Sequence, residues 1–166
     1  MKHHEPPNPE ELEEIQELNL LFLIYLRSAA SEGGSCLGMP PRSVAKLRNL
    51  SSAALEAMAV FPRSLFILDL ENLAATGDDP VLPSTPLAQS RQALCLTILH
   101  GAWNMCRQRD FQARMFLRLS VVMSRRLRTM PLSELLLLSA VPNVLGCASP
   151  DAEPLWDALL DRRQAN

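Results

Sequence analysis

The stretch LLFLIYL, residues 20 to 26, decides how this chain folds. It continues a helical pattern in which Leu12, Ile15, Leu18 and Phe22 recur at helical spacing. Because this later part is apolar on every side, we expect it to be buried on every side. In a chain of 166 residues, one way to bury it is against a second copy of the same unit, within the chain or between chains.

The predicted helix begins at Asn8, a good N-cap, which Pro9 and the capping-box carboxylate of Glu11 follow. It ends near residue 30, where SEGGS breaks it. A short helix is expected at 41 to 48, then a turn at NLSS, a second short helix AALEAMAV, and a stop at Pro62. RSLFILDL follows, as a short extended segment or a helical turn.

The same order of elements returns in the second half of the chain. LRNLSSAALEAMAVFP at 47 to 62 falls without a gap on LRTMPLSELLLLSAVP at 127 to 142, and a long apolar helix precedes each, at 9 to 30 and at 87 to 107. We therefore predict an all-α fold of two helical units packed as an internal pseudo-dimer. The expected units are 1–75 and 87–166, joined by a linker at 76–86; the second adds helical stretches at 111–118 and 121–128, a loop at 141–154 and a terminal helix.

Composition and spacing exclude several classes of protein. The longest apolar run is far shorter than the roughly 20 residues that cross a bilayer, and the acidic N-terminus lacks the layout of a signal peptide. Four widely spaced cysteines form no CxxC pair, so we expect reduced thiols in the cytoplasm rather than a zinc site or a disulfide framework: Cys36, Cys95, Cys106 and Cys147.

No catalytic pattern is present. The histidines are His3, His4 and His100, and the chain has no Ser-His-Asp order, no HExxH and no glycine-rich phosphate loop. His100 is expected to be a packed or edge residue, and Trp103 and Trp156 are expected in the core. The sequence therefore predicts a protein that is not an enzyme and that binds neither a cofactor nor a metal.

Charge is unevenly distributed: glutamates crowd the N-terminus and arginines crowd residues 107 to 128. Two short helices around a tight turn have the outline of a helix-turn-helix, although a plain helical hairpin has the same outline. Neither second helix carries a basic residue, so contact with phosphate, or with an acidic protein partner, falls to the residues before them. These are Arg42, Lys46, Arg48, Arg125, Arg126 and Arg128. A solvated helix face is the alternative.

LNLLFLIYL, LGMPPRSVAKLRNLSSAALEAMAV and SLFILDLEN, within residues 12 to 72, resemble the FlhD family, the small subunit of the bacterial flagellar activator. LTILHGAWNMCRQRDFQARMFLRL and LRTMPLSELLLLSA resemble it again. The resemblance implies an all-helical tandem FlhD, a zinc-containing partner subunit FlhC, and activation of flagellar operons by the complex on DNA. A family cysteine that can link two subunits falls at Phe66, so that crosslink is not carried over. The acidic, proline-rich TGDDPVLPSTP stands where the family has residues close to DNA, which counts against inherited DNA contacts at this place.

Two functions follow. One is a FlhD-like regulatory subunit that acts through a partner, such as FlhC or another regulator, with weak or indirect DNA contact. The other is an adaptor or antagonist linked to flagellar or type III secretion systems, without DNA binding. A homo-oligomer is a further expectation, and no membrane partner is expected. The residues predicted at the interface between halves or copies are Leu20, Phe22, Ile24, Leu26, Leu94, Ile98 and Leu99.

Overall fold

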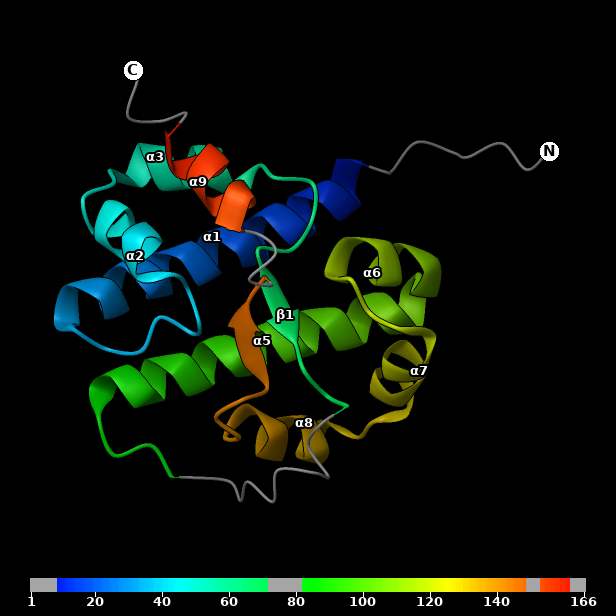
Figure 1. The fold of residues 1–166 in the computed structure, drawn as a ribbon. Coiled ribbons are helices and arrows are strands. Elements are labelled where there is room, and N and C mark those ends of the chain that lie inside the picture. The colour runs from blue at the N-terminus through cyan, green and yellow to red at the C-terminus, as the bar shows by residue number, and fades with distance from the viewer. Residues whose placement is uncertain (1–8, 72–81, 149–152, 162–166) are drawn as a thin grey trace.

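A computed structural model describes residues 9 to 71, 82 to 148 and 153 to 161 (Figure 1). The first half contains α1 (Pro9–Glu32), α2 (Pro41–Arg48), α3 (Ser52–Ala59) and β1 (Phe66–Leu68). The second contains α5 (Pro86–Gln108), α6 (Asp110–Leu117), α7 (Val121–Thr129), α8 (Leu132–Ser139), β2 (Leu145–Cys147) and α9 (Glu153–Asp161). The predicted helical fold class is confirmed, and the predicted cap at Asn8 lies outside the described residues.

The two long helices, α1 and α5, pack against each other and run in opposite directions (Figure 1). Near the middle of both helices they come close at Gly101, where an added Cβ would lie 3.1 Å from Cδ1 of Leu18. Near the end of α1, a Cβ on Gly34 would overlap the side chain of Leu87. Glycine at both places lets the backbone of one segment approach the side chains of the other.

A pair of short helices packs against each long helix: α2 and α3 against α1, and α7 and α8 against α5. The offset that places residue 47 on residue 127 in the sequence repeat also places the first residue of α2 on the first residue of α7. It places the whole of α3 on α8. Gly38 and Arg118, which the same shift superimposes, both have left-handed backbones, with φ of 83° and 56°. The halves differ in their connectors, because α6 occupies the connection after α5, whereas residues 33 to 40 are not helical.

β1 and β2 form a two-stranded antiparallel sheet in which Phe66 lies opposite Cys147 and Leu68 opposite Leu145. The extended alternative for RSLFILDL is therefore correct, whereas the loop predicted at 141–154 was wrong where β2 lies. A strand of this length has too few positions to display a period of two, and its hydrogen-bonding partner is distant in sequence. Each strand region also reaches the other half: Ser64 N donates to Phe116 O (2.9 Å), and Cys147 N donates to Leu37 O (2.8 Å).

One continuous hydrophobic core runs through both halves. Trp156 of α9 is fully buried, and this helix packs on α2 of the first half. The expectation that residues 20 to 26 are buried on every side was wrong, because Leu21 is 43% exposed and Ile24 is 44% exposed. The helices that pack most closely on α1, which are α2, α3 and α5, leave the stripe with Leu21 and Ile24 uncovered. Among the described helices, none is both long and apolar enough to cross a membrane.

Candidate partner and nucleic-acid interface

The basic residues of α2 are mostly occupied by contacts within the molecule. Lys46 Nζ lies 2.6 Å from Oδ1 of Asp161 and 3.5 Å from Oδ1 of Asp157, both on α9. The hydrogen bond to Asp161 raises the pKa of Lys46. Arg48 donates from Nε and Nη2 to the carbonyl of Ala30, near the end of α1 (3.1 and 2.7 Å). Of the three predicted contacts on α2, the exposed Arg42 remains for a phosphate or a partner.

On α7 the three predicted arginines also differ. Arg126 Nη1 donates to Leu70 O at 2.8 Å, next to β1, and Nη2 lies 3.9 Å from Glu134 Oε1. This guanidinium therefore joins α7 to the first half of the chain. Arg125 and Arg128 are exposed, and within the described residues their side chains form no hydrogen bond or ion pair. They are the arginines of α7 that a ligand can reach without displacing a contact.

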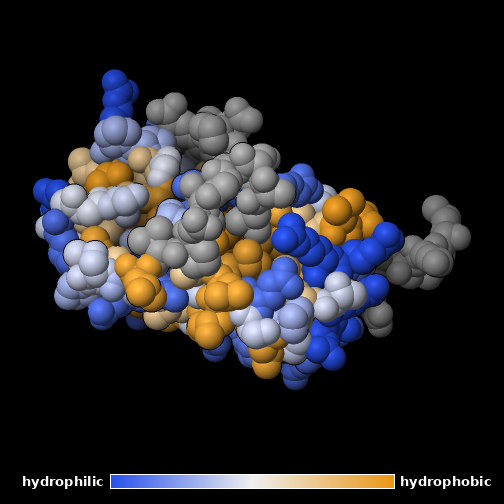
Figure 2. All heavy atoms as spheres, turned by 90° about the horizontal axis from the view of Figure 1, so that it is seen from below, coloured by the Kyte–Doolittle hydropathy of each residue, from blue (hydrophilic) through white to orange (hydrophobic). Residues whose placement is uncertain are grey.

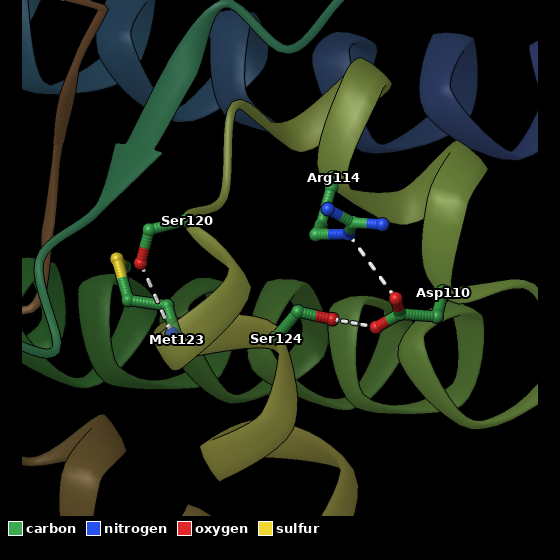
Figure 3. A network of polar contacts seen from close by, with 5 residues as sticks. All are labelled: Asp110, Arg114, Ser120, Met123 and Ser124. Carbon is green, nitrogen blue, oxygen red and sulfur yellow. Dashed lines mark hydrogen bonds and ion pairs between the residues drawn. The ribbon is translucent and has the colours of Figure 1, made fainter.

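A small polar network holds α7 against α6 (Figure 3). Asp110, in the first turn of α6, accepts hydrogen bonds from the Ser124 hydroxyl and from Arg114 Nε, the latter at 3.1 Å. The Ser124 hydrogen bond and then Arg114 keep the pKa of Asp110 below its usual value. Ser120 caps the start of α7 by accepting from Met123 N at 3.1 Å. The position of the arginines on α7 therefore depends on residues that precede it.

Helix α8, the second helix of its hairpin, presents leucine rather than basic side chains to the surface. Leu132, Leu136 and Leu137 are 58, 53 and 58% exposed, while Leu135 and Leu138 are buried. α8 lies along α5, and Figure 2 shows hydrophobic residues gathered on the face where α8 lies in Figure 1. A helix that reads base edges needs hydrogen-bond donors, which leucine lacks. This face is suited to an apolar protein surface.

The residues predicted at the interface between the halves lie in different environments in the structure. Five of them are buried in the shared core: Phe22, Leu26, Leu94, Ile98 and Leu99. Leu20 is half-buried and faces its own half, beside Glu56 and Ala59 of α3. Ile24 lies at an open groove of about 400 Å³ that Leu87 and Leu94 of α5 also line. Leu18, which packs against Gly101 of α5, was not among the predicted residues.

Asn19 is a further residue that sequence reasoning missed. Its buried side-chain amide donates to the carbonyls of Ala59, Phe61 and Arg63 at 3.3, 3.2 and 2.9 Å. Its Oδ1 accepts from Leu65 N at 2.8 Å. One side chain of α1 thus holds the whole segment between α3 and β1. The signal was the single amide side chain within LNLLFLIYL.

The remaining candidates for chemistry are placed as follows. His100 is exposed and stacks on Trp103, with ring centroids 5.8 Å apart. Trp103 is half-buried and packs against the core, and Trp156 is fully buried as predicted. The four cysteines are free. Among the described residues, no three His, Cys, Asp or Glu side chains come together as a metal site would require; His3 and His4 lie outside them.

No family model, no characterised protein and no solved structure matches this chain. The resemblance to FlhD therefore rests on the sequence motifs described above.

Proposed function

We propose that this protein is a FlhD-like regulatory subunit that binds a FlhC-like partner through the exposed face of α8, and that its own contact with DNA is weak and non-specific. The observation that carries the proposal is the surface of α8, which offers three exposed leucines and no basic side chain. Exposed leucines gathered on one helix are typical of a surface that a partner covers. The FlhD resemblance supplies the identity of that partner.

We further propose that the two halves form the internal counterpart of a FlhD dimer. Supporting this, α2 and α3 correspond to α7 and α8 at a constant offset in the numbering, and each pair packs on its own long helix. The antiparallel pairing of β1 with β2 is also the arrangement that a two-fold axis through the sheet would produce. A chain of this kind occupies the place of two FlhD subunits beside its partner.

Co-expression with a FlhC-like protein, followed by purification through a tag on that protein, tests the interaction. The double variant Leu136→Ser/Leu137→Ser removes apolar surface from α8, and we expect it to reduce recovery of the complex at least tenfold. Val60→Ser is the matched control, because Val60 lies at the end of α3 and is 58% exposed, as Leu137 is. Equal recovery of all three proteins would show that α8 is not the docking face.

Fluorescence anisotropy with random and promoter DNA at several salt concentrations tests the statement about DNA. We expect weak binding by the isolated chain, with each phosphate contact contributing about −0.9 to the slope of log affinity against log salt. Arg125→Ala/Arg128→Ala should flatten that slope, whereas Arg126→Ala should leave it unchanged because Arg126 is bound to Leu70 O. Tight, promoter-selective binding by the isolated chain would contradict the proposal.

The second candidate function is an adaptor or antagonist that occupies the partner without reaching DNA. It is favoured by the internal contacts of Lys46, Arg48 and Arg126, which take half of the predicted basic contacts away from any nucleic acid. Adding this protein to a preformed complex of the FlhC-like partner and promoter DNA separates the two functions. A regulatory subunit gives a larger complex that retains DNA, whereas an antagonist releases the DNA.

A further inference from the structure

An open groove of about 670 Å³ lies between α5 and the turn that joins α7 to α8. Trp103 and Arg107 line it from α5, and Arg128 and Thr129 line it from α7. Met130 and Pro131 of the turn and Leu132 at the start of α8 complete the lining, so the groove joins two cations to an apolar surface. Among the described residues, no acidic side chain lines it.

Both arginines are available to a ligand. The guanidinium of Arg107 lies over the indole of Trp103, 4.5 Å from the ring centroid, which orients the side chain without neutralising its charge. Within the described part of the chain, the side chains of Arg107 and Arg128 form no hydrogen bond and no ion pair. Asp110, whose pKa Arg128 helps to lower, is itself bound to Ser124 and Arg114.

The corresponding place in the first half shows what is special about this groove. There Arg27 stands at the position that the repeat aligns with Arg107, and it donates to Leu50 O at 3.1 Å. Arg48, which the repeat aligns with Arg128, donates to Ala30 O. Both arginines of the first half are therefore used to satisfy backbone carbonyls of that half.

Among the described residues of the second half, neither arginine forms the corresponding hydrogen bond. Trp103 Nε1 donates to Met130 O at 2.9 Å, the carbonyl that corresponds to Leu50 O, and within the described residues Arg107 keeps only its contact with the Trp103 ring. The cap is different as well: Ser51 caps α3 through Ala54 N, whereas Pro131 gives α8 no side-chain cap. Among the described residues, the groove thus has two guanidinium groups without a hydrogen bond or an ion pair. At its edge α8 begins without a side-chain cap and with Glu134 in its first turn.

These charges select the chemistry of a ligand. Guanidinium groups pair with carboxylates and with phosphates, often through two hydrogen bonds. The apolar lining from Met130 to Leu132 needs an aliphatic or aromatic group next to that carboxylate. A nucleic acid could satisfy the two arginines with phosphates, but it has no aliphatic side chain for this apolar lining, so the lining favours a peptide.

We propose that this groove binds an acidic, apolar peptide segment of a partner protein, with Arg107 and Arg128 holding a carboxylate while the neighbouring apolar side chain lies against Met130, Pro131 and Leu132. The assignment goes beyond the proposed function, because it does not depend on whether the partner resembles FlhC or on binding by the face of α8. It names the charge and the apolar character of the segment that is recognised.

The test uses the full chain and three fluorescent peptides, ELELEL, KLKLKL and ESESES, with anisotropy as the readout. We expect ELELEL to bind, ESESES to bind at least tenfold more weakly, and KLKLKL not to bind. Amide and indole NMR spectra recorded during the ELELEL titration should show the Trp103 indole signal moving, while that of the buried Trp156 stays in place.

Arg107→Gln/Arg128→Gln removes both charges at nearly constant size and should weaken ELELEL binding at least tenfold. Arg63→Gln/Arg118→Gln is the matched control, because it removes a second pair of exposed arginines that lie near each other outside the groove. The NMR spectrum of each variant reports whether it is folded. Absence of ELELEL binding to the native chain, equal loss in both variants, or stronger binding and the same indole shift with a short single strand of DNA would each overturn the proposal.

Discussion

At the scale of single residues, Asn19 shows how one polar side chain can organise a core. It lies on the buried side of α1 and satisfies three carbonyls and one N–H of the segment that leads from α3 into β1. An unpaired buried amide would be costly, and here both ends of the amide are paired. The position of β1, and through it the pairing with β2, therefore depends on this residue.

We expect Asn19→Leu to destabilise the protein, even though the new side chain is of similar size and apolar. The N–H of Leu65 would lose its acceptor and three carbonyls would lose their donor, and the unpaired Leu65 N–H by itself costs about 1–3 kcal/mol. Urea unfolding followed by circular dichroism measures the difference. Asn49→Leu, at an exposed position after α2, is the control and should change stability by no more than about 0.5 kcal/mol. Equal midpoints for the two variants would refute this role of Asn19.

The cysteines lead to a second prediction at the same scale. Burial raises the pKa of Cys95 and of Cys147 to about 12, whereas Cys36 is only half-buried. Only the thiolate reacts, and at pH 8 a thiol with that pKa is ionised in about one molecule in ten thousand. We expect Cys36 to react first with a thiol reagent in the native protein, as mass spectrometry of peptides can show. Cys36→Ser should remove the fast phase, and in urea all cysteines should react at similar rates.

At the scale of elements, α1 is covered on three sides and open on one. Leu26 and Phe22 are fully buried, while Leu21 and Ile24 face solvent. A helix segment that is apolar on every side is therefore not buried on every side here. Its uncovered stripe lies at the groove between α1 and α5. The same composition thus contains core positions and surface positions that the sequence alone does not distinguish.

This difference predicts different costs for two leucines of α1. Leu26→Ala should lower the free energy of unfolding by about 2–5 kcal/mol, since it leaves a cavity in the core. Leu20→Ala should cost less than half as much, because Leu20 is half-buried beside α3 and water can replace the lost methyl groups. Chemical denaturation of both variants measures this. Equal costs would mean that Leu20 lies in the core as well.

At the scale of the whole molecule, the two halves hold each other in place at several points. α1 packs on α5, β1 pairs with β2, and α9 from the end of the chain packs on α2 near its start. Lys46 and Arg126 add contacts between the halves through Asp161 and Leu70. The core is continuous across this boundary, so neither half keeps its buried surface covered without the other.

Cutting the chain between the halves should therefore leave them together. We expect a variant with a protease site inserted between residues 76 and 81 to elute as one species after cleavage, because the shared core and the strand pairing do not require the linker. Size-exclusion chromatography with and without urea measures this, with the uncut variant as the control. Two fragments that separate in native buffer would show that the halves are independent domains.

Much of this architecture could be predicted from the sequence, because it depends on local order. The short helices were predicted from proline, serine and glycine signals at their ends, and α7 and α8 lie close to where the repeat places them. The basic character of α7 and the absence of cations from α8 are also properties of composition. These features belong to neighbouring residues along the chain, so they need no knowledge of what packs against them.

The availability of individual side chains was decided only by the tertiary structure, because it depends on contacts between residues that are distant in the sequence. The sequence offered six basic side chains as equivalent candidates, but folding joins Lys46 to α9 and Arg126 to Leu70. Among the described residues, it leaves Arg107 without a hydrogen bond because Trp103 takes the carbonyl that corresponds to the one Arg27 takes in the first half. Local pattern therefore determined which helices form, whereas long-range packing determined which of their charges and leucines remain for a partner.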